Sequence, residues 1–262
     1  MEITGMTRIC GIVGYPLHAA QAPATMNAVA ARLEVDVAFI PVEIADDGLD
    51  NLLRTARGWN NLAGFIVTMP YKVPVLSLID SFTRRAAVAG NVNVVRRTSD
   101  GNLVGDQLDG TAMVRCLLVR GIPLRGARIV VLGAGAVGRS ISFALAGESP
   151  AAISIVNRSE LRAVKLVEEL KAFDPAVSTM VGTMSDVTNA DILINATSVG
   201  SPINPGIPVE SEMLPRHAAV ADVVTSPNPT QLLKSAAGSG CEIVTGMDMQ
   251  RAQIMDILSF LG

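Results

Sequence analysis

The segment Val130-Val131-Leu132-Gly133-Ala134-Gly135-Ala136-Val137-Gly138-Arg139-Ser140 decides the fold of this chain. An apolar run leads into the pattern G-x-G-x-x-G, and the pattern opens a segment of helical character. Gly133 permits the tight turn, Gly135 lets the backbone approach a pyrophosphate, and Gly138 lets the helix lie close to the strand. The N–H groups at the helix start would face the phosphates, and the helix dipole favours their charge. The pattern predicts a dinucleotide-binding unit, and its alternative is a glycine-rich turn without a nucleotide.

The composition narrows the class of protein. A chain of 262 residues suits one large domain or two smaller ones, and 49% hydrophobic residues supply a substantial core. The net charge of −3 does not indicate the excess of positive charge that is typical of proteins that bind nucleic acids. No apolar run is long enough to span a bilayer, and the N-terminus shows no targeting segment. We therefore expect neither a nucleic-acid nor a membrane partner.

The cysteines and histidines argue against a disulfide framework and against a metal site. The three cysteines, Cys10, Cys116 and Cys241, are scattered and odd in number, which is typical of a reducing compartment. They lack metal-ligand spacing, and His18 and His217 are the only histidines. We expect a cytoplasmic protein without a bound metal.

Strand and helix patterns alternate along the first hundred residues. Apolar runs predict strands at 8–14, 37–42 and 62–68, and helices are predicted at 24–33 and 49–57. This alternation predicts a parallel α/β sheet before the glycine motif is reached. The motif therefore begins a second α/β domain.

The second domain alternates in the same way. The strands expected there are 129–132, 153–156, 179–182, 192–195 and 220–224, and the helices expected are 111–119, 161–173 and 250–261. The helix at 111–119 is the expected hinge between the two domains.

Lys72 and Asp109 are the candidates for acid–base chemistry. Lys72 is one of four lysines, and it follows a predicted strand through Thr68-Met69-Pro70-Tyr71, at the carboxyl end where α/β sheets hold ligands. A desolvated lysine there can serve as acid or base, whereas its plain alternative is an exposed loop lysine. Asp109 precedes a predicted helix, where a carboxylate caps the helix or pairs with Lys72 beside a nicotinamide.

Ordered motifs in the first half resemble the shikimate and quinate dehydrogenase family. Gly14-x-Pro16 resembles the opening loop of the family, and Gly64-x-x-Val67-Thr68-x-Pro70-x-Lys72 resembles its G-x-N-V-T-x-P-x-K. Gly90-Asn91-Val92-Asn93-Val94 resembles a degraded G-A-x-N-T, and Asp109-Gly110 matches the aspartate of N-T-D-x-x-G.

The resemblance continues through the second half. Asn157-Arg158-Ser159 resembles the family's N-R-[ST], and Asn195-Ala196-Thr197-Ser198-Val199-Gly200 resembles its N-A-T-x-x-G. Gly246-Met247-x-Met249 with Gln253 resembles the C-terminal signature. The resemblance thus covers nearly the whole chain.

The resemblance implies two α/β domains with a cleft between them and the reversible oxidation of a ring hydroxyl by NADP. Residues 1–108 would form the substrate-binding domain, completed by the helix 246–262, and residues 109–245 would form a Rossmann-type NADP-binding domain. Lys72 and Asp109 would be the catalytic pair, and Thr68, Asn93 and Gln253 would bind substrate hydroxyls.

NADP is favoured over NAD by the residues after the second strand of the second domain. NAD-specific folds usually place an acid there, but this chain has Asn157-Arg158-Ser159, followed by Arg162. A guanidinium group can donate two parallel hydrogen bonds to a 2′-phosphate. The alternative is that Arg158 and Arg162 are merely solvated at the start of a helix. The expected cofactor-binding residues are Gly133, Gly135, Ala136, Val137, Gly138, Asn157, Arg158, Ser159, Arg162, Thr197 and Gly246.

The departures from the family gather at the end of the pocket that holds the substrate carboxylate. The family's S-x-S is Ala20-Gln21-Ala22, and Thr225 stands where a tyrosine is common. Ile66 replaces the asparagine of G-x-N-V-T, and Gln107-Leu108 replaces the N-T before the aspartate. Each hydrogen bond lost to a carboxylate costs about 1.5–3 kcal/mol. Three losses would weaken shikimate binding about a thousandfold or more.

We therefore expect an NADP-dependent oxidoreductase whose substrate is a cyclic polyol with an altered group at the carboxylate position. Gln21 or His18 would contact that group. Two alternatives stay open. One is a genuine shikimate dehydrogenase in which Gln21 and backbone N–H groups hold the carboxylate, and the other is a non-catalytic NADP-binding regulator. The expected assembly is a monomer or a homodimer.

Overall fold

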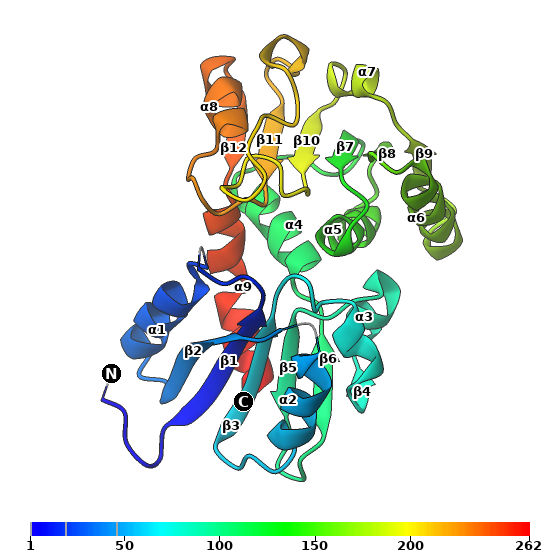
Figure 1. Cartoon of the computed structure of the whole chain (residues 1–262). Coiled ribbons are helices and arrows are strands. Elements are labelled where there is room, and N and C mark those ends of the chain that lie inside the picture. Colours follow the sequence, from blue (N-terminus) through cyan, green and yellow to red (C-terminus); the bar gives the residue numbers. More distant parts are fainter. Residues whose placement is uncertain (1, 19, 46) are drawn as a thin grey trace. The chain divides into compact units, whose positions relative to one another are not determined.

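The computed structural model describes residues 2–18, 20–45 and 47–262, and the chain divides into two compact units (Figure 1). The first unit runs to Leu108 and also includes Gln253–Gly262, and the second unit is Asp109–Ala252. The division falls inside the last helix, α9 (Gly246–Leu261). Both units are α/β, so the expected fold class is confirmed at the level of two α/β domains.

The first unit is built on a six-stranded sheet of order β2-β1-β3-β5-β6-β4. Its strands are β1 (Arg8–Gly14), β2 (Val37–Glu43), β3 (Leu62–Val67), β4 (Ser81–Phe82), β5 (Val94–Arg97) and β6 (Leu103–Asp106). Its helices are α1 (Ala22–Arg32), α2 (Gly48–Ala56), the 3₁₀ turn η1 (Pro74–Ser77) and α3 (Arg84–Ala89).

The sheet of the first unit is mixed: the three strands that the pattern predicts are parallel, as expected, and the antiparallel strand β5 is one that the pattern does not predict. The first three strands are parallel, but β5 runs antiparallel to both β3 and β6. The connection between β5 and β6 has only the five residues 98–102, and a parallel pair would need a crossover of a dozen or more. The reversal brings Asn93, just before β5, to the same end of the sheet as the end of β6.

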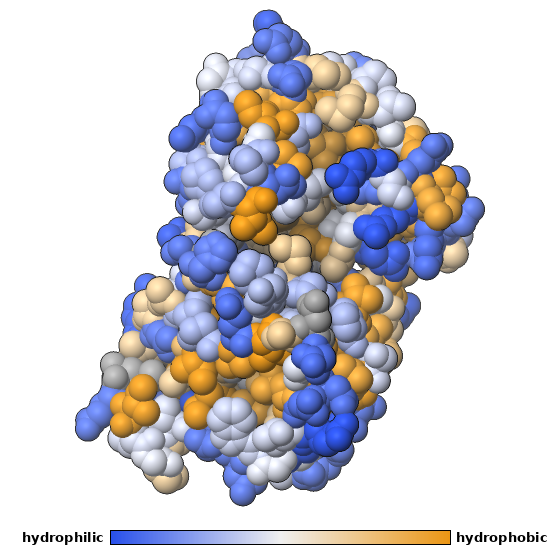
Figure 2. All heavy atoms as spheres, in the orientation of Figure 1, coloured by the Kyte–Doolittle hydropathy of each residue, from blue (hydrophilic) through white to orange (hydrophobic). Residues whose placement is uncertain are grey.

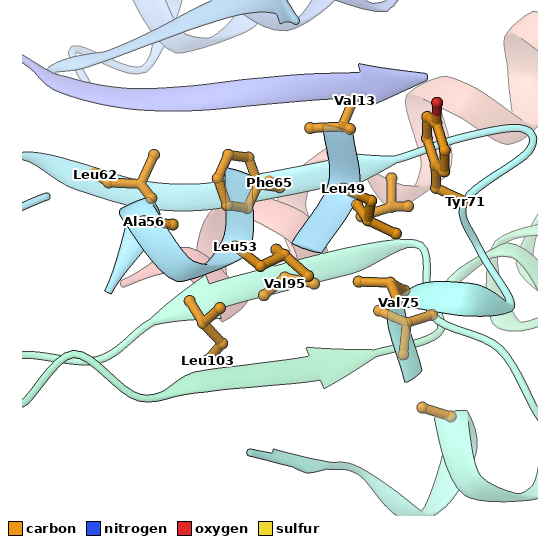
Figure 3. Close-up of a cluster of buried hydrophobic side chains, with 13 residues drawn as sticks. Val13, Leu49, Leu53, Ala56, Leu62, Phe65, Tyr71, Val75, Val95 and Leu103 are labelled. Atoms are coloured by element: carbon orange, nitrogen blue, oxygen red, sulfur yellow. The ribbon is translucent and has the colours of Figure 1, made fainter. Parts of the chain in front are cut away.

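Apolar clusters cover the two faces of this sheet. Along β1 the side chains alternate, so Cys10 and Ile12 belong to one cluster and Val13 to the other. The cluster of Val13 also contains Phe65 from β3 and residues of α2 (Figure 3). The opposite cluster includes Leu108 and three side chains of α9, namely Ile254, Ile257 and Leu261. The end of the chain therefore completes the core of the first unit.

The second unit is built on a parallel six-stranded sheet of order β12-β11-β10-β7-β8-β9. Its strands are β7 (Arg128–Leu132), β8 (Ala152–Val156), β9 (Ser178–Val181), β10 (Ile192–Asn195), β11 (Ala219–Asp222) and β12 (Glu242–Val244). Its helices are α4 (Asp109–Val119), α5 (Ala136–Ala146), α6 (Glu160–Phe173), α7 (Met184–Val187), the 3₁₀ turn η2 (Ser211–Met213) and α8 (Gln231–Gly238), together with the first part of α9. The strand order reverses at β7, which is the switch point where such sheets bind ligands.

Several helices begin earlier than the sequence pattern predicts, and α9 shows the largest difference. Helix α9 starts at Gly246 and not at residue 250, because Thr245 and Asp248 form a capping box. The Thr245 hydroxyl accepts a hydrogen bond from the Asp248 N–H at 3.1 Å, and the Asp248 carboxylate accepts the Thr245 N–H at 3.0 Å. Helix α4 starts at Asp109 and not at residue 111.

Hydrophobic side chains are also exposed on both units (Figure 2). They include Met6 and Ile40 in the first unit and Val119 and Leu161 in the second. Among the helices of the described residues, none has the length and apolar character needed to cross a membrane.

Asp222, at the carboxyl end of β11, is a fully buried acid in the second unit. Its carboxylate accepts hydrogen bonds from the Asn195 amide at 2.9 Å, the Val224 N–H at 3.0 Å and the Thr230 hydroxyl at 2.7 Å. Burial raises the pKa of Asp222 to about 6, although the hydrogen bonds act in the other direction. Asp222 thus ties the loop after β10 to the loop after β11.

We expect Asp222 to make the stability of the second unit depend on pH. Since its folded pKa lies above the ordinary value of 3.8, its contribution is fully present below about pH 4 and is lost as the pH rises through about 6. Asp222→Asn, which mimics the protonated acid, should lack this dependence. Between about pH 4 and pH 7 the wild type should lose up to about 3 kcal/mol relative to the variant in denaturant unfolding. Parallel pH profiles of the two proteins would contradict this assignment.

Candidate active site

Asn93 joins four segments of the first unit. Its side-chain Nδ2 donates to Oε1 of Gln253 at 3.0 Å, and its Oδ1 accepts the N–H of Leu108 at 2.8 Å. Its backbone carbonyl accepts the N–H of Val67 at 2.8 Å, and its own N–H donates to the carbonyl of Asp106 at 3.0 Å. Asn93 is buried, with 3% of its surface exposed. The structure therefore brings together the ends of β3 and β6, the start of β5 and helix α9.

Thr68 and Lys72 lie in the turn that follows β3. The Thr68 N–H donates to the carbonyl of Val13 at 2.8 Å, and the Thr68 carbonyl accepts the N–H of Tyr71 at 2.9 Å. The carbonyl of Lys72 accepts the N–H of Val92 at 2.8 Å, directly before Asn93 in the chain. Thr68 and Lys72 are half-buried. Four of the expected residues, Thr68, Lys72, Asn93 and Gln253, therefore share one hydrogen-bonded region of the first unit.

Asp109 is the first residue of α4 and is the first residue of the second unit. Only 4% of its surface is exposed. It follows Leu108 directly, and the N–H of Leu108 is held by Asn93. The residue that precedes Asp109 is thus held by the same amide that holds Gln253.

The opening loop is held to the turn after β3 and to β2. The Tyr15 N–H donates to the carbonyl of Met69 at 3.0 Å, and the Leu17 N–H donates to the carboxylate of Glu43 at 2.6 Å. The Ala20 N–H closes a turn on the carbonyl of Leu17 at 2.8 Å. Of the residues expected near the substrate carboxylate, Gln21 is the exposed N-cap of α1 without a side-chain capping bond, and Ala22 is its first residue.

The glycine loop of the second unit has the shape that a pyrophosphate requires. Gly133 has φ of 107°, a conformation that side chains disfavour, and a Cβ at Gly138 would collide with the carbonyl oxygen of Gly133. A Cβ at Gly135 would meet no atom within 4 Å, so open space lies in front of it. Gly135 is the N-cap of α5 and provides no side chain to cap the helix, whose first turn contains Ala136, Val137 and Gly138. The loop fits a bound phosphate group.

Side chains after β8 and β10 complete this end of the sheet. The Ala134 N–H donates to Oδ1 of Asn157 at 3.0 Å, and Nδ2 of Asn157 donates to the carbonyl of Ser159 at 2.8 Å. The Thr197 hydroxyl donates to Oδ1 of Asn195 at 2.6 Å. A Cβ at Gly133 would lie 3.0 Å from the Thr197 methyl carbon. Asn157 and Thr197 therefore flank the glycine loop.

Arg158 and Arg162 are exposed at the start of α6, with Glu160 between them. Their position after β8 is the one that meets the ribose of a dinucleotide in this type of sheet. Gly246 lies elsewhere in the second unit, at the start of α9, where the carbonyls of Val223 and Val224 leave no room for a side chain. The residues around the glycine loop fit NADP by their open phosphate site and their exposed guanidinium groups.

Sequence reasoning missed several supporting polar residues. Thr230 donates to Asp222, Asp222 accepts a hydrogen bond from Asn195, and Asn195 in turn holds Thr197 beside the glycine loop. Asn91 and Gln107 form a buried amide pair in the first unit. The Asn195–Asp222 and Asn91–Gln107 contacts join residues 27 and 16 positions apart in the chain, so no local pattern reveals them.

Comparison with known proteins identifies the family. Residues 12–95 match the shikimate dehydrogenase substrate binding domain, and residues 118–228 match the shikimate / quinate 5-dehydrogenase domain. The chain is 33% identical to the shikimate dehydrogenase (NADP(+)) of Rhodospirillum rubrum over 252 residues, which cover 94% of this chain and 89% of that protein.

Solved structures agree with the sequence comparison. The shikimate 5-dehydrogenase of Listeria monocytogenes in complex with shikimate and NAD superposes with a TM-score of 0.87 at 28% identity, covering 100% of this chain and 93% of that one. The ligand-free 5-ketofructose reductase of Gluconobacter sp. strain CHM43 superposes with a TM-score of 0.85 at 30% identity, covering 97% of this chain and 92% of that one. The sequence motifs, the two α/β units and these matches together show that the chain belongs to the shikimate/quinate dehydrogenase family.

Proposed function

We propose that this NADP-dependent oxidoreductase interconverts a secondary hydroxyl and a ketone on a polyhydroxylated ring, with shikimate and 3-dehydroshikimate as the first candidate pair. The observation that supports it most is the Asn93–Gln253 amide pair beside the turn of Thr68 and Lys72. The names of the curated relatives favour shikimate over an altered substrate. In this proposal the first unit binds the ring and the second unit binds NADP.

The two amides are suited to substrate hydroxyls. Asn93 donates to Oε1 of Gln253, so in this proposal Nε2 of Gln253 would be the group that donates to a ligand. An amide held in this way would donate to a ring oxygen in a defined direction. The proposed role of Asn93 and Gln253 is therefore to set which hydroxyl meets the reacting groups.

Lys72 and Asp109 are the proposed catalytic pair. NADP supplies or accepts the hydride when bound. The Lys72 ammonium would donate a hydrogen bond to the oxygen on the reacting carbon and exchange a proton with it. The Asp109 carboxylate would orient the same hydroxyl by accepting its hydrogen bond.

A carboxylate-free polyol is the second candidate substrate. The side chains of Ala20 and Ala22 offer no hydroxyl, and Gln21 is the one polar side chain among these three positions. Losing the hydroxyl donors would weaken binding of a carboxylate by about tenfold or more for each. The likeness to a 5-ketofructose reductase supports this candidate as well.

Initial rates with the purified protein distinguish these candidates. Shikimate with NADP(+) should give turnover with a low KM if shikimate is the substrate, and 5-ketofructose with NADPH should give it if the second candidate is right. Lys72→Ala should lower kcat at least about a hundredfold, the usual contribution of a positioned acid or base. Lys234→Ala, which removes an exposed lysine of α8, is the control and should change nothing.

Two outcomes would contradict the proposal. Unchanged kcat in Lys72→Ala would remove Lys72 from the mechanism. NADP binding without turnover of either substrate would favour the regulatory alternative.

Arg158 and Arg162 should set the preference for NADP over NAD. Removing a charge-assisted hydrogen bond to the 2′-phosphate costs about 1.5–3 kcal/mol, which corresponds to a rise of about tenfold to a hundredfold in the Kd for NADP. We expect this rise in the Kd for NADP in Arg158→Ala and in Arg162→Ala, with little change in the Kd for NAD. Lys165→Ala, an exposed lysine on the same helix, serves as the control. Equal rises in the Kd for NADP and for NAD in fluorescence titration would show that these arginines do not bind the 2′-phosphate.

A further inference from the structure

Two departures from the family motifs meet in the first unit. Asn91 stands where the family pattern has alanine, and Gln107 stands where it has the asparagine before T-D. In the structure, Nε2 of Gln107 donates a hydrogen bond to Oδ1 of Asn91. Asn91 is fully buried and Gln107 is 3% exposed. The two changes therefore form one buried contact and are not separate losses.

The Asn91 side of this contact is fixed by helix α3. Gly90 is the C-cap of α3 in the left-handed conformation, and Asn91 follows it. Nδ2 of Asn91 donates to the carbonyl of Ala89 at 3.0 Å, in the last turn of the helix. The amide of Asn91 is thus oriented by the helix end before it meets Gln107.

The Gln107 side is fixed through Asp106. The Gln107 N–H donates to the Asp106 carboxylate at 2.7 Å, and the same carboxylate accepts hydrogen bonds from Thr83 and Arg85. Thr83 is the N-cap of α3. Burial acts to raise the pKa of Asp106, but the Arg85, Thr83 and Gln107 hydrogen bonds outweigh it and hold the pKa below its ordinary value. The end of β6 is therefore anchored at the start of α3, and Asn91 follows the end of the same helix.

The contact lies next to both groups that the proposed reaction uses. Asn91 stands two residues before Asn93, and Gln107 stands two residues before Asp109. The same two loops are also joined by the bond from the Leu108 N–H to Asn93. Movement of either loop would shift Asn93 or the segment that leads to Asp109.

We propose that Asn91 and Gln107 form an amide clamp that positions Asn93 and Asp109 for the reaction. The clamp acts through the two loops, so both are positioning residues and not catalytic residues. The positioning role of the clamp in the reaction rests on the proposed function, whereas the contact between Asn91 and Gln107 does not depend on it.

The test compares single variants with an exchanged pair. Asn91→Ala and Gln107→Ala each remove the hydrogen bond between the two buried amides, whereas Asn91→Gln combined with Gln107→Asn retains both amides and their summed length. Asn27→Ala is the matched control, because Asn27 holds Phe39 through two amide hydrogen bonds in the same unit but far along the chain from the clamp.

The first readout is amide hydrogen exchange, which needs no substrate. In both single variants, exchange in peptides covering 90–95 and 105–112 should become about tenfold faster, as expected for loss of a buried hydrogen bond. The exchanged pair should recover most of the protection. Asn27→Ala should accelerate exchange near Phe39 and leave 105–112 unchanged. Unchanged exchange in the single variants, or no recovery in the exchanged pair, would overturn the clamp.

The second readout is kinetic, with whichever of shikimate or 5-ketofructose the wild type turns over. The single variants should lower kcat about tenfold with the KM for NADP unchanged, and the exchanged pair should recover it. Asn27→Ala should keep the wild-type kcat. Faster exchange with unaltered kcat would overturn the positioning role. If the wild type turns over neither compound, the proposed function fails, and the exchange data alone decide whether the clamp exists.

Discussion

The side-chain amide of Asn93 is the contact on which the substrate end of the first unit depends. One amide holds Leu108, where the chain leaves this unit, and Gln253, where the chain has returned to it. An amide can do both because it presents a donor and an acceptor in fixed directions. Asn93 lies at the end of the sheet because β5 is antiparallel, so the short β5–β6 connection is part of the site's construction.

The shape of the glycine loop in the second unit depends on steric contacts and not on one central polar side chain. The glycine loop is tight because Gly138 lies against the Gly133 carbonyl, and it is open because Gly135 faces free space. Polar side chains then fix the surrounding loops, with Asn157 on one side and the Asn195–Asp222 pair on the other. The glycine loop is hydrogen-bonded to its neighbouring loop where the phosphates would bind, and Arg158 and Arg162, which would meet the 2′-phosphate, are exposed.

Local patterns predicted the parts of the structure that local physics determines. The strands β1, β3 and β7, the glycine loop and the positions of Thr68 and Lys72 follow from hydrophobic runs and turn residues. The direction of β5 was not predicted, since it depends on the length of a connection between two strands, β5 and β6, that the pattern did not predict. The early start of α9 depends on the Thr245–Asp248 capping box. The Asn91–Gln107 contact joins side chains 16 residues apart, so only the folded chain reveals it.

In the proposed mechanism, Asn93 and Gln253 hold the ring that reacts. A crystal structure of the protein with NADP(+) and shikimate, or with the carboxylate-free polyol that the rate measurements favour, would locate that ring. We expect a ring hydroxyl within hydrogen-bond distance of Nε2 of Gln253, with the Asn93–Gln253 bond intact and Lys72 Nζ on the oxygen of the reacting carbon. A ring bound away from these amides, or a complex in which the Asn93–Gln253 bond is broken, would contradict it.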